Sequence, residues 1–320
     1  MSLLTAQYSA EKRTGDVRRE RARLLVVGDW GDRGAPGQTR TARALLSVYR
    51  SDIPDAFLSL GDNVYVEADD DVSYANAFHE SFSQVYTRSM FGSTPWWSVL
   101  GNHDYFHPVR KQMAFSCLDN RWNMPSRSFV VDFPQRVRHG PIISVFAVDT
   151  NPFIREYRRE YEGDGRFFDF EELVGRCPDE RAWDHWERAT LASLDGALSR
   201  SQASWNVVIG HHAIVNASTK HGSHPELSGL DNVLRRNGVC LYMNGHDHSL
   251  QHVQRGGVAY VTSGAGSKFR KDVRFCTDGL MFGHEGIGFT GITADRSRLA
   301  FQHYCGESGA RLYEHCFYHP

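Results

Sequence analysis

The stretch Leu24-Leu25-Val26-Val27-Gly28-Asp29 near the start of the chain is a short apolar run with an abrupt polar stop. A run of this length that is apolar throughout is typical of a strand buried on both faces, as in a parallel sheet. The pattern recurs along the chain, and each run is followed by Gly, Asp, Asn, Ser or His. The further runs are Ala56–Leu60, Trp97–Leu100, Ile142–Val148, Val207–Ile209, Val239–Met243 and Val258–Thr262.

Helical patterns lie between several of these runs. The clearest covers Arg181–Ala203, where one stripe contains Trp183, Trp186, Thr190, Leu194 and either Ala197 or Leu198. Shorter patterns cover Thr39–Arg50, Val72–Arg88 and Asp231–Arg236, the last ended by Gly238. Alternating strands and helices predict an α/β layered fold. In such folds the functional site lies beyond the carboxyl ends of the strands.

Composition limits the class of protein. The 320 residues include 36 Lys and Arg against 38 Asp and Glu, a net charge of −2, with 41% hydrophobic residues. This balance argues against a disordered chain and against a nucleic-acid binder held by net basic charge. No apolar run approaches the roughly 18 residues of a membrane span. We expect a polar tail over residues 1–22 and a single catalytic domain over residues 23–320.

Cysteine spacing and the first residues leave the compartment open. The six cysteines form no Cys-x-x-Cys pair, which argues against a thiolate zinc site. Residues 1–10 lack a charged segment followed by an apolar one, so they do not resemble a signal peptide. Asn216-Ala217-Ser218 is a glycosylation sequon, which matters only in an exported protein.

The residues that follow the predicted strands are oxygen and nitrogen donors without a thiolate. Such donors suit iron, zinc or manganese, and seven or eight of them from several loops fit two ions better than one. Each residue alone has an ordinary explanation as a turn residue, a helix cap or a hydrogen-bonded core histidine. Their order on consecutive strand ends favours a metal site. The candidates are Asp29, Asp62, Tyr65, Asn102, His103, His211, His246 and His248.

These blocks resemble the metal-binding blocks of the purple acid phosphatases, which belong to the metallophosphoesterase superfamily. The resemblance covers most of residues 23–320, and the flanking segments Leu241–Asn244 and Ser263–Gly266 are similar to the small, tartrate-resistant type. The five blocks are Gly28-Asp29-Trp30-Gly31, Gly61-Asp62-Asn63-Val64-Tyr65, Gly101-Asn102-His103-Asp104, Gly210-His211 and Gly245-His246-Asp247-His248.

One pair of positions distinguishes the purple type. Most metallophosphoesterases place a His two residues after the first Asp, but this chain has Gly31 there. Tyr65, three residues after Asp62, supplies a replacement donor. A phenolate is a hard anionic ligand that favours trivalent iron over a divalent ion.

The resemblance implies a ligand set and a fold. Asp29, Tyr65 and His248 would hold Fe(III), and Asp62 would bridge it to a divalent ion of iron, zinc or manganese. The divalent ion would be held by Asn102, His211 and His246. The implied architecture is a four-layer sandwich of two central mixed sheets flanked by helices, with the site at one edge.

The implied activity is that of an acid phosphatase that hydrolyses phosphate monoesters with a metal-bound hydroxide. His103 and His221 are the candidates for the general acid, although His221 lies one residue further from His211 than in the mammalian type. We expect Asp104 to orient His103, and His224 to be exposed on the surface.

Several alternatives stay open. A phosphodiesterase or nucleotide pyrophosphohydrolase on the same scaffold is the first, and oxygen-radical chemistry at an iron pair is the second. A non-catalytic metal-binding module is disfavoured because the ligands and His103 are all present. Substrates would be small phosphate esters, with phosphoproteins or nucleotides included, and the oligomeric state is open.

The family resemblance implies an extracellular, lysosomal or vacuolar location. Cys177 has no cysteine near His221 to pair with, which leaves Cys305 with Cys316 as a possible disulfide.

Overall fold

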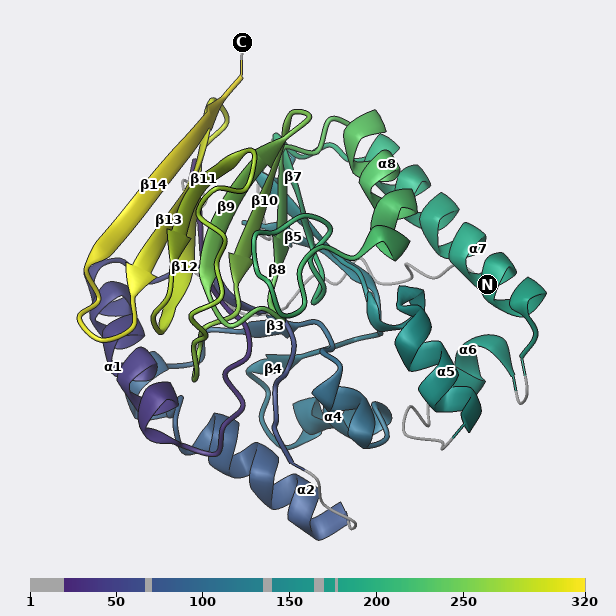
Figure 1. The fold of residues 1–320 in the computed structure, drawn as a ribbon. Helices are drawn as coiled ribbons and strands as arrows, with labels where there is room; N and C mark the ends of the chain where they lie inside the picture. Colours follow the sequence, from purple (N-terminus) through teal and green to yellow (C-terminus); the bar gives the residue numbers. More distant parts are fainter. Residues whose placement is uncertain (1–19, 67–70, 135–139, 164–169, 176–177, 320) are drawn as a thin grey trace.

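Two seven-stranded sheets form the centre of the protein in a computed structural model that describes residues 20–66, 71–134, 140–163, 170–175 and 178–319 (Figure 1). The first sheet runs in the order β14 (Arg311–Tyr318), β13 (Arg298–Cys305), β12 (Gly288–Ala294), β1 (Ala22–Val27), β2 (Ala56–Ser59), β3 (Trp96–Ser98) and β4 (Trp122–Asn123). The second runs in the order β11 (Leu280–His284), β9 (Leu250–Arg255), β10 (Val258–Ser263), β8 (Leu241–Asn244), β7 (Trp205–Ile209), β6 (Ile143–Ala147) and β5 (Phe129–Phe133).

Both sheets are mixed, which confirms the predicted fold class. Strands β1 to β4 are parallel to one another, and so are β6, β7, β8 and β10. Strands β12, β13 and β14 extend the first sheet in antiparallel pairing. Strands β5, β9 and β11 do the same for the second sheet. All the predicted strands are present, and their ends lie within two residues of the expected ones.

The two sheets bury a common apolar layer between them. Leu24 and Val26 of β1 pack in this layer with Val207 and Ile209 of β7. Because successive side chains of a strand point to opposite faces, Leu25 and its neighbours face the helices on the outside instead. Both faces of the central strands are therefore buried, which explains why their sequences are apolar without alternation.

Helices cover the outer faces of the sheets, with α1 beside the first sheet and α7 and α8 beside the second (Figure 1). The predicted apolar stripe of the long helix is confirmed, because the residues of that stripe are buried. They are Trp183, Trp186, Thr190, Leu194 and Leu198. Asp179 caps this helix by accepting a hydrogen bond from the backbone N–H of Ala182 at 2.9 Å. The helices are α1 (Pro36–Ser51), α2 (Asp71–Phe78), α3 (Arg88–Phe91), α4 (Arg110–Ala114), α5 (Arg155–Gly163), α6 (Glu171–Val174), α7 (Glu180–Ser199) and α8 (Ser228–Arg236).

The predicted helix over Val72–Arg88 is wrong in its second half. Helix α2 ends at Phe78 and passes into a π-helical turn over His79–Ser83. There Ser81 accepts a hydrogen bond from the backbone N–H of Arg33 through its hydroxyl and from the side chain of Gln38 through its carbonyl. These bonds to the loop after β1 and to the first turn of α1 compete with a regular α-helical pattern.

The suggested pairing of Cys305 with Cys316 is also wrong. Both thiols are free, because the register of β13 and β14 sets Cys316 opposite Ala300, five residues before Cys305. Cys177 lies outside the described residues, as does almost all of the predicted tail. The sequon residue Asn216 is buried, and its side chain donates a hydrogen bond to Asp247.

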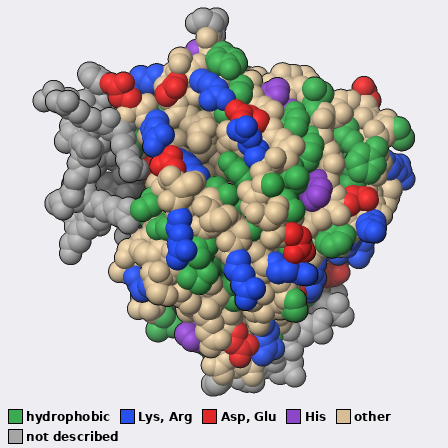
Figure 2. All heavy atoms as spheres, turned by 90° about the vertical axis from the view of Figure 1, so that its left-hand side faces the viewer, with side chains coloured by type: hydrophobic (Ala, Val, Ile, Leu, Met, Phe, Trp, Pro, Cys, Tyr) green, Lys and Arg blue, Asp and Glu red, His purple; other side chains and the backbone are tan. Residues whose placement is uncertain are grey.

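The surface carries no single dominant charge on the side where β14 and α1 lie. Figure 2 shows basic, acidic and apolar side chains interspersed on this face. No helix in the described part of the chain is both long and apolar enough to cross a membrane.

Candidate metal centre

The predicted donors come together because they follow strands whose carboxyl ends meet at one edge of the sheets. Asp29 follows β1, Asp62 follows β2 and Asn102 follows β3 in the first sheet. His211 follows β7 and His246 follows β8 in the second sheet. The two parallel halves therefore contribute to the same site, as expected for this class of sheet.

Three of these residues have a left-handed backbone. The φ angles are 57° at Asp29, 52° at Asp62 and 68° at His246. Such angles are uncommon for residues other than glycine, and they cluster at functional sites where surrounding structure holds them. Each turns the chain sharply at the end of a strand, which directs the side chain across the sheet edge toward the others.

Asp29, Tyr65 and His248 form a compact triangle of donor atoms. The Tyr65 hydroxyl lies 3.3 Å from Asp29 Oδ1 and 3.3 Å from His248 Nε2, and the latter two atoms are 3.4 Å apart. Atoms that bind one ion at about 2.0–2.1 Å lie about 2.9–3.4 Å from one another, depending on the coordination geometry. The triangle therefore has the dimensions of three ligands of a single ion.

A second group surrounds His211. Its Nε2 lies 3.2 Å from Asn102 Oδ1 and 3.5 Å from Asp62 Oδ1. Its Nδ1 lies 2.7 Å from the carbonyl oxygen of Leu60, to which it donates a hydrogen bond. This bond fixes the tautomer and leaves the lone pair of Nε2 directed at the other donors, as in histidine ligands of metals.

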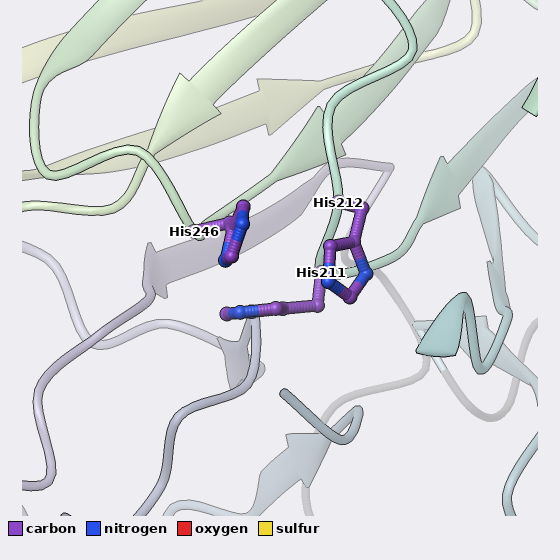
Figure 3. Close-up of side chains that lie close together, drawn as sticks. All are labelled: His211, His212 and His246. Carbon is purple, nitrogen blue, oxygen red and sulfur yellow. The ribbon is translucent and has the colours of Figure 1, made fainter. Parts of the chain in front are cut away.

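His246 completes this second group. Its ring centre is 5.0 Å from that of His211, and Figure 3 shows the ring of His211 extending below His246. The backbone N–H of His246 donates a hydrogen bond to Asp29 Oδ2 at 2.9 Å. This bond joins the group around His211 directly to the triangle that contains Asp29. Donor atoms of Asp29, Asp62 and His211 lie within 4.8 Å of one another. The seven predicted ligands thus surround one buried region.

His212 is adjacent to this region but has other partners (Figure 3). Its Nδ1 lies 2.8 Å from the Thr150 hydroxyl, and its Nε2 lies 3.2 Å from the Tyr157 hydroxyl. The backbone N–H groups of His211 and His212 both donate to the Thr150 hydroxyl oxygen, at 3.2 and 3.1 Å. Thr150 therefore holds the loop of His211, a predicted ligand, and the sequence alone did not indicate this role.

The charge of the site calls for a cation. Asp29 and Asp62 are buried, and neither forms an ion pair with a Lys or Arg among the described residues. Burial, opposed by the nearby His211, raises the pKa of Asp29. At Asp62 burial is outweighed by His211 and His103, and the pKa is lowered. Buried carboxylates need a compensating positive charge, and bound metal ions would supply it.

The neutral ligands fit the same interpretation. Burial lowers the pKa of His246 and lowers that of His248 to about 4, so both rings are held in the form that binds a metal. Burial and the charges of Asp62 and Asp29 raise the pKa of the Tyr65 phenol well above its usual range. The phenol would therefore need a strongly acidic cation to bind as phenolate.

Asp104 has a different role from the one predicted. It makes no hydrogen bond to His103, because its carboxylate points under the loops of the first sheet. It accepts from the backbone N–H of Gly101 at 2.7 Å, from Asn63 N and Nδ2 at 3.0 Å each, and from Gln112 Nε2 at 2.6 Å. Asp104 therefore ties the loop of Asp62 to the loop of Asn102.

The two candidate acids lie beside the predicted metal ligands. The His103 ring packs against Tyr65 with ring centres 4.8 Å apart, and its backbone N–H donates to Asp62 Oδ1 at 3.0 Å. The half-buried His221 ring lies 4.2 Å from that of His246. Despite the longer spacing in sequence, the structure thus brings His221 to the site.

The expectation that His224 is exposed is wrong. Its ring lies 5.1 Å from that of His212 and 5.5 Å from that of His246, and its Nε2 is buried without a hydrogen-bond partner among the described residues. The backbone N–H of His224 donates to the carbonyl of Ala213, which draws the segment back over the loop that follows β7.

The close approach of two backbone segments at Gly31 leaves no room for the histidine that most metallophosphoesterases have at this position. A Cβ atom at this position would lie only 2.3 Å from the backbone carbonyl of Asn63. The two segments are held together by hydrogen bonds from Gly31 N to the Asp62 carbonyl at 3.2 Å and from Tyr65 N to the Gly31 carbonyl at 2.8 Å. The same close approach that excludes a side chain at Gly31 brings Tyr65 into the site.

Comparison with known proteins agrees with this geometry. The chain belongs to the family of calcineurin-like phosphoesterases, whose profile matches residues 22–250. It is 36% identical to purple acid phosphatase 17 of Arabidopsis thaliana, over 89% of this chain and 81% of that protein. It is 30% identical to human tartrate-resistant acid phosphatase type 5, over 77% of this chain and 73% of the relative. The chain is thus a metallophosphoesterase related to both kinds of acid phosphatase.

Solved structures share the fold at lower sequence identity. GAP50, described as the anchor in the inner membrane complex of Plasmodium, aligns with a TM-score of 0.74 at 20% identity and covers 93% of this chain and 89% of its own. Purple acid phosphatase PPD1 of yellow lupin aligns with a TM-score of 0.64 at 17% identity, over 93% of this chain and 54% of its own. These likenesses confirm the two-sheet architecture.

Proposed function

We propose that this protein is an acid phosphatase that hydrolyses phosphate monoesters at an Fe(III)–M(II) pair, with iron, zinc or manganese as M. The observation that carries the proposal is the triangle of Asp29, Tyr65 and His248, because a phenolate in that position selects a trivalent ion. Asn102, His211 and His246 would hold the divalent ion, and Asp62 would bridge the two. The ligands come from both sheets, which supports one catalytic domain over residues 23–320.

The chain itself would position the substrate and move its proton. When bound, the two ions would attract the phosphate and lower the pKa of bound water enough for hydrolysis in acid. The His103 ring lies beside Tyr65, and the His221 ring lies beside His246. Either imidazole, when protonated, would donate a proton to the leaving oxygen or hold the phosphoryl oxygens. We expect an acid optimum, and a pH–rate profile that peaks well above neutrality would count against the proposal.

A visible absorption spectrum with metal analysis tests the ferric site. The purified protein should be pink or purple from charge transfer between Tyr65 and Fe(III), and Tyr65→Phe should lose the colour. The matched control is Tyr318→Phe, because Tyr318 is a 68% exposed residue of the distant edge strand β14. A colourless, iron-free and fully active preparation would overturn the assignment of Fe(III).

A substrate comparison tests the reaction class. Turnover of a monoester should exceed that of a diester of the same phenol, since Gly31 and Tyr65 distinguish this site from that of most metallophosphoesterases. A preference for the diester would favour a phosphodiesterase, the alternative on the same scaffold. Oxygen-radical chemistry would require iron at both positions, so an iron–zinc protein with full phosphatase activity would argue against it as the main function.

A further inference from the structure

Arg270 lies at the border of the metal site, although no part of the proposed reaction uses it. Its backbone N–H donates to the carbonyl of ligand His248 at 2.8 Å. The next residues run beside the segment of His221, because Ser218 pairs with Val273 and the Thr219 N–H donates to the Asp272 carbonyl at 2.9 Å. Arg270 therefore sits between a metal-binding histidine and a candidate acid.

The guanidinium group of Arg270 has no partner in the part of the chain that the structure describes. Its Nη1 is buried there without a hydrogen bond, and the side chain forms no ion pair with any described residue. The neighbouring Lys268 differs, since its Nζ lies 3.0 Å from a carboxylate oxygen of Asp32 and 4.8 Å from the ring centre of Tyr65. A shielded guanidinium nitrogen without an acceptor is costly, and the group binds carboxylate or phosphate in a bidentate manner.

The charge of Arg270 lies at the border of the site. The backbone of Arg270 is hydrogen-bonded to that of His248, and Lys268, two residues earlier, lies 4.8 Å from the ring centre of Tyr65. The described surroundings offer no carboxylate in contact with the guanidinium to neutralise this charge. An anion that enters the site beside His221 and His248 would therefore meet a cation in addition to the metal ions.

We propose that Arg270 is a specificity-determining residue that binds a second phosphate group of the substrate, next to the one that is cleaved. The proposal rests on the phosphatase function proposed above. The favoured substrates would be phosphoanhydrides and esters with two neighbouring phosphates, of which inorganic pyrophosphate is the simplest. A guanidinium matches the second phosphate through two parallel hydrogen bonds, whereas a monoester with an uncharged leaving group offers it nothing to bind.

The test compares two substrates on the metal-loaded full chain. We would measure kcat/KM for pyrophosphate and for p-nitrophenyl phosphate with the wild type, Arg270→Gln and Arg270→Lys. Arg270→Gln should lower the ratio of the two constants by about tenfold, mainly through KM for pyrophosphate, because a tenfold loss corresponds to about 1.4 kcal/mol, the order of one charge-assisted hydrogen bond. The ratio for Arg270→Lys should lie between those of the wild type and Arg270→Gln, since lysine keeps the positive charge but lacks the two parallel N–H donors of the guanidinium. The control Lys271→Gln, an exposed neighbour, should leave the ratio unchanged.

The outcomes separate the possibilities. An unchanged ratio for Arg270→Gln overturns the proposal, whether both rates stay high or fall together, because an equal fall means that Arg270 supports the metal site or the cleaved phosphate. Loss of metal in the variant lowers both rates and leaves the ratio interpretable. A wild type inactive on both substrates would instead refute the phosphatase function itself.

Discussion

Gly31→Ala perturbs the feature that separates this site from those with a histidine at the same position. The new Cβ would lie 2.3 Å from both the carbonyl carbon and oxygen of Asn63 and 2.4 Å from the nitrogen of Val64. Real Cβ atoms essentially never come closer than 3.0 Å, so the two backbone segments must separate by about 0.7 Å. The obstacle is backbone rather than the end of a flexible side chain, which rules out an easy rearrangement.

The expected loss of stability and activity in Gly31→Ala follows from the residues that flank the displaced backbone. Asp62 precedes it and Tyr65 ends it, and the Tyr65 hydroxyl lies 3.3 Å from both Asp29 and His248. Overpacking of this kind costs about 1–3 kcal/mol of stability. A misplacement of about 1 Å at a reacting centre costs about a hundredfold in rate, so we expect kcat to fall by roughly tenfold to a hundredfold.

Three measurements on the purified variant check this reasoning. The melting temperature should fall by a few degrees, iron content or the charge-transfer band should decrease, and kcat for a monoester should drop. Gly196→Ala in α7 is the matched control, because its Cβ meets only the mobile end of Arg200 and a helical alanine stabilises by about 0.5–1 kcal/mol. A Gly31→Ala protein with wild-type colour, stability and turnover would refute the link between Gly31 and Tyr65.

Three further predictions concern charge. Asp62→Asn should lower bound metal to one ion or fewer per chain and reduce phosphatase activity by on the order of a hundredfold or more, measured by metal analysis and turnover. Chelation of the metals should lower the melting temperature, because the buried carboxylates of Asp29 and Asp62 lose their compensating charge; an unchanged temperature would argue that they pair otherwise. Burial lowers the pKa of His303 to about 3, below its usual 6.5 or so, and its ring is held by Thr290 at 2.9 Å. The neutral ring is thus favoured in the folded state, so stability falls as pH decreases from about 6.5 toward 3, and His303→Gln should make this loss smaller in denaturant titrations at pH 7 and pH 4.5.

Much of the central fold could be predicted because buried parallel strands are locally distinctive. The run before Asp29 is apolar throughout since both of its faces are covered, and the stripe of α7 has a clear helical period. The edge strands escaped prediction for the opposite reason. In β14 the pattern Arg311–Tyr318 mixes charged, aromatic and polar residues, since this edge strand is only partly buried.

The convergence of the candidate donors could be predicted from the sequence, but the residues that support them could not. Asp29 and His246 stand out in the sequence because each ends an apolar run. Nothing in the sequence places Thr150 under the loop of His211, or turns Asp104 away from the adjacent His103, because both depend on which loops approach each other in space. The partial burial of His224 also could not be predicted, because a bond from its backbone N–H to the carbonyl of Ala213 draws the segment inward.

The left-handed backbone at Asp29, Asp62 and His246 shows how the site depends on the whole fold. Each such angle costs of order 1–3 kcal/mol and persists only where surrounding structure holds it. The hydrogen bond from His246 N–H to Asp29 Oδ2 links two of these strained turns across the sheets. Because one turn belongs to each sheet, the donor atoms reach their spacing only when both sheets have packed together. Metal binding should therefore follow assembly of the sheets and then stabilise it, which couples the proposed cofactor to the fold itself.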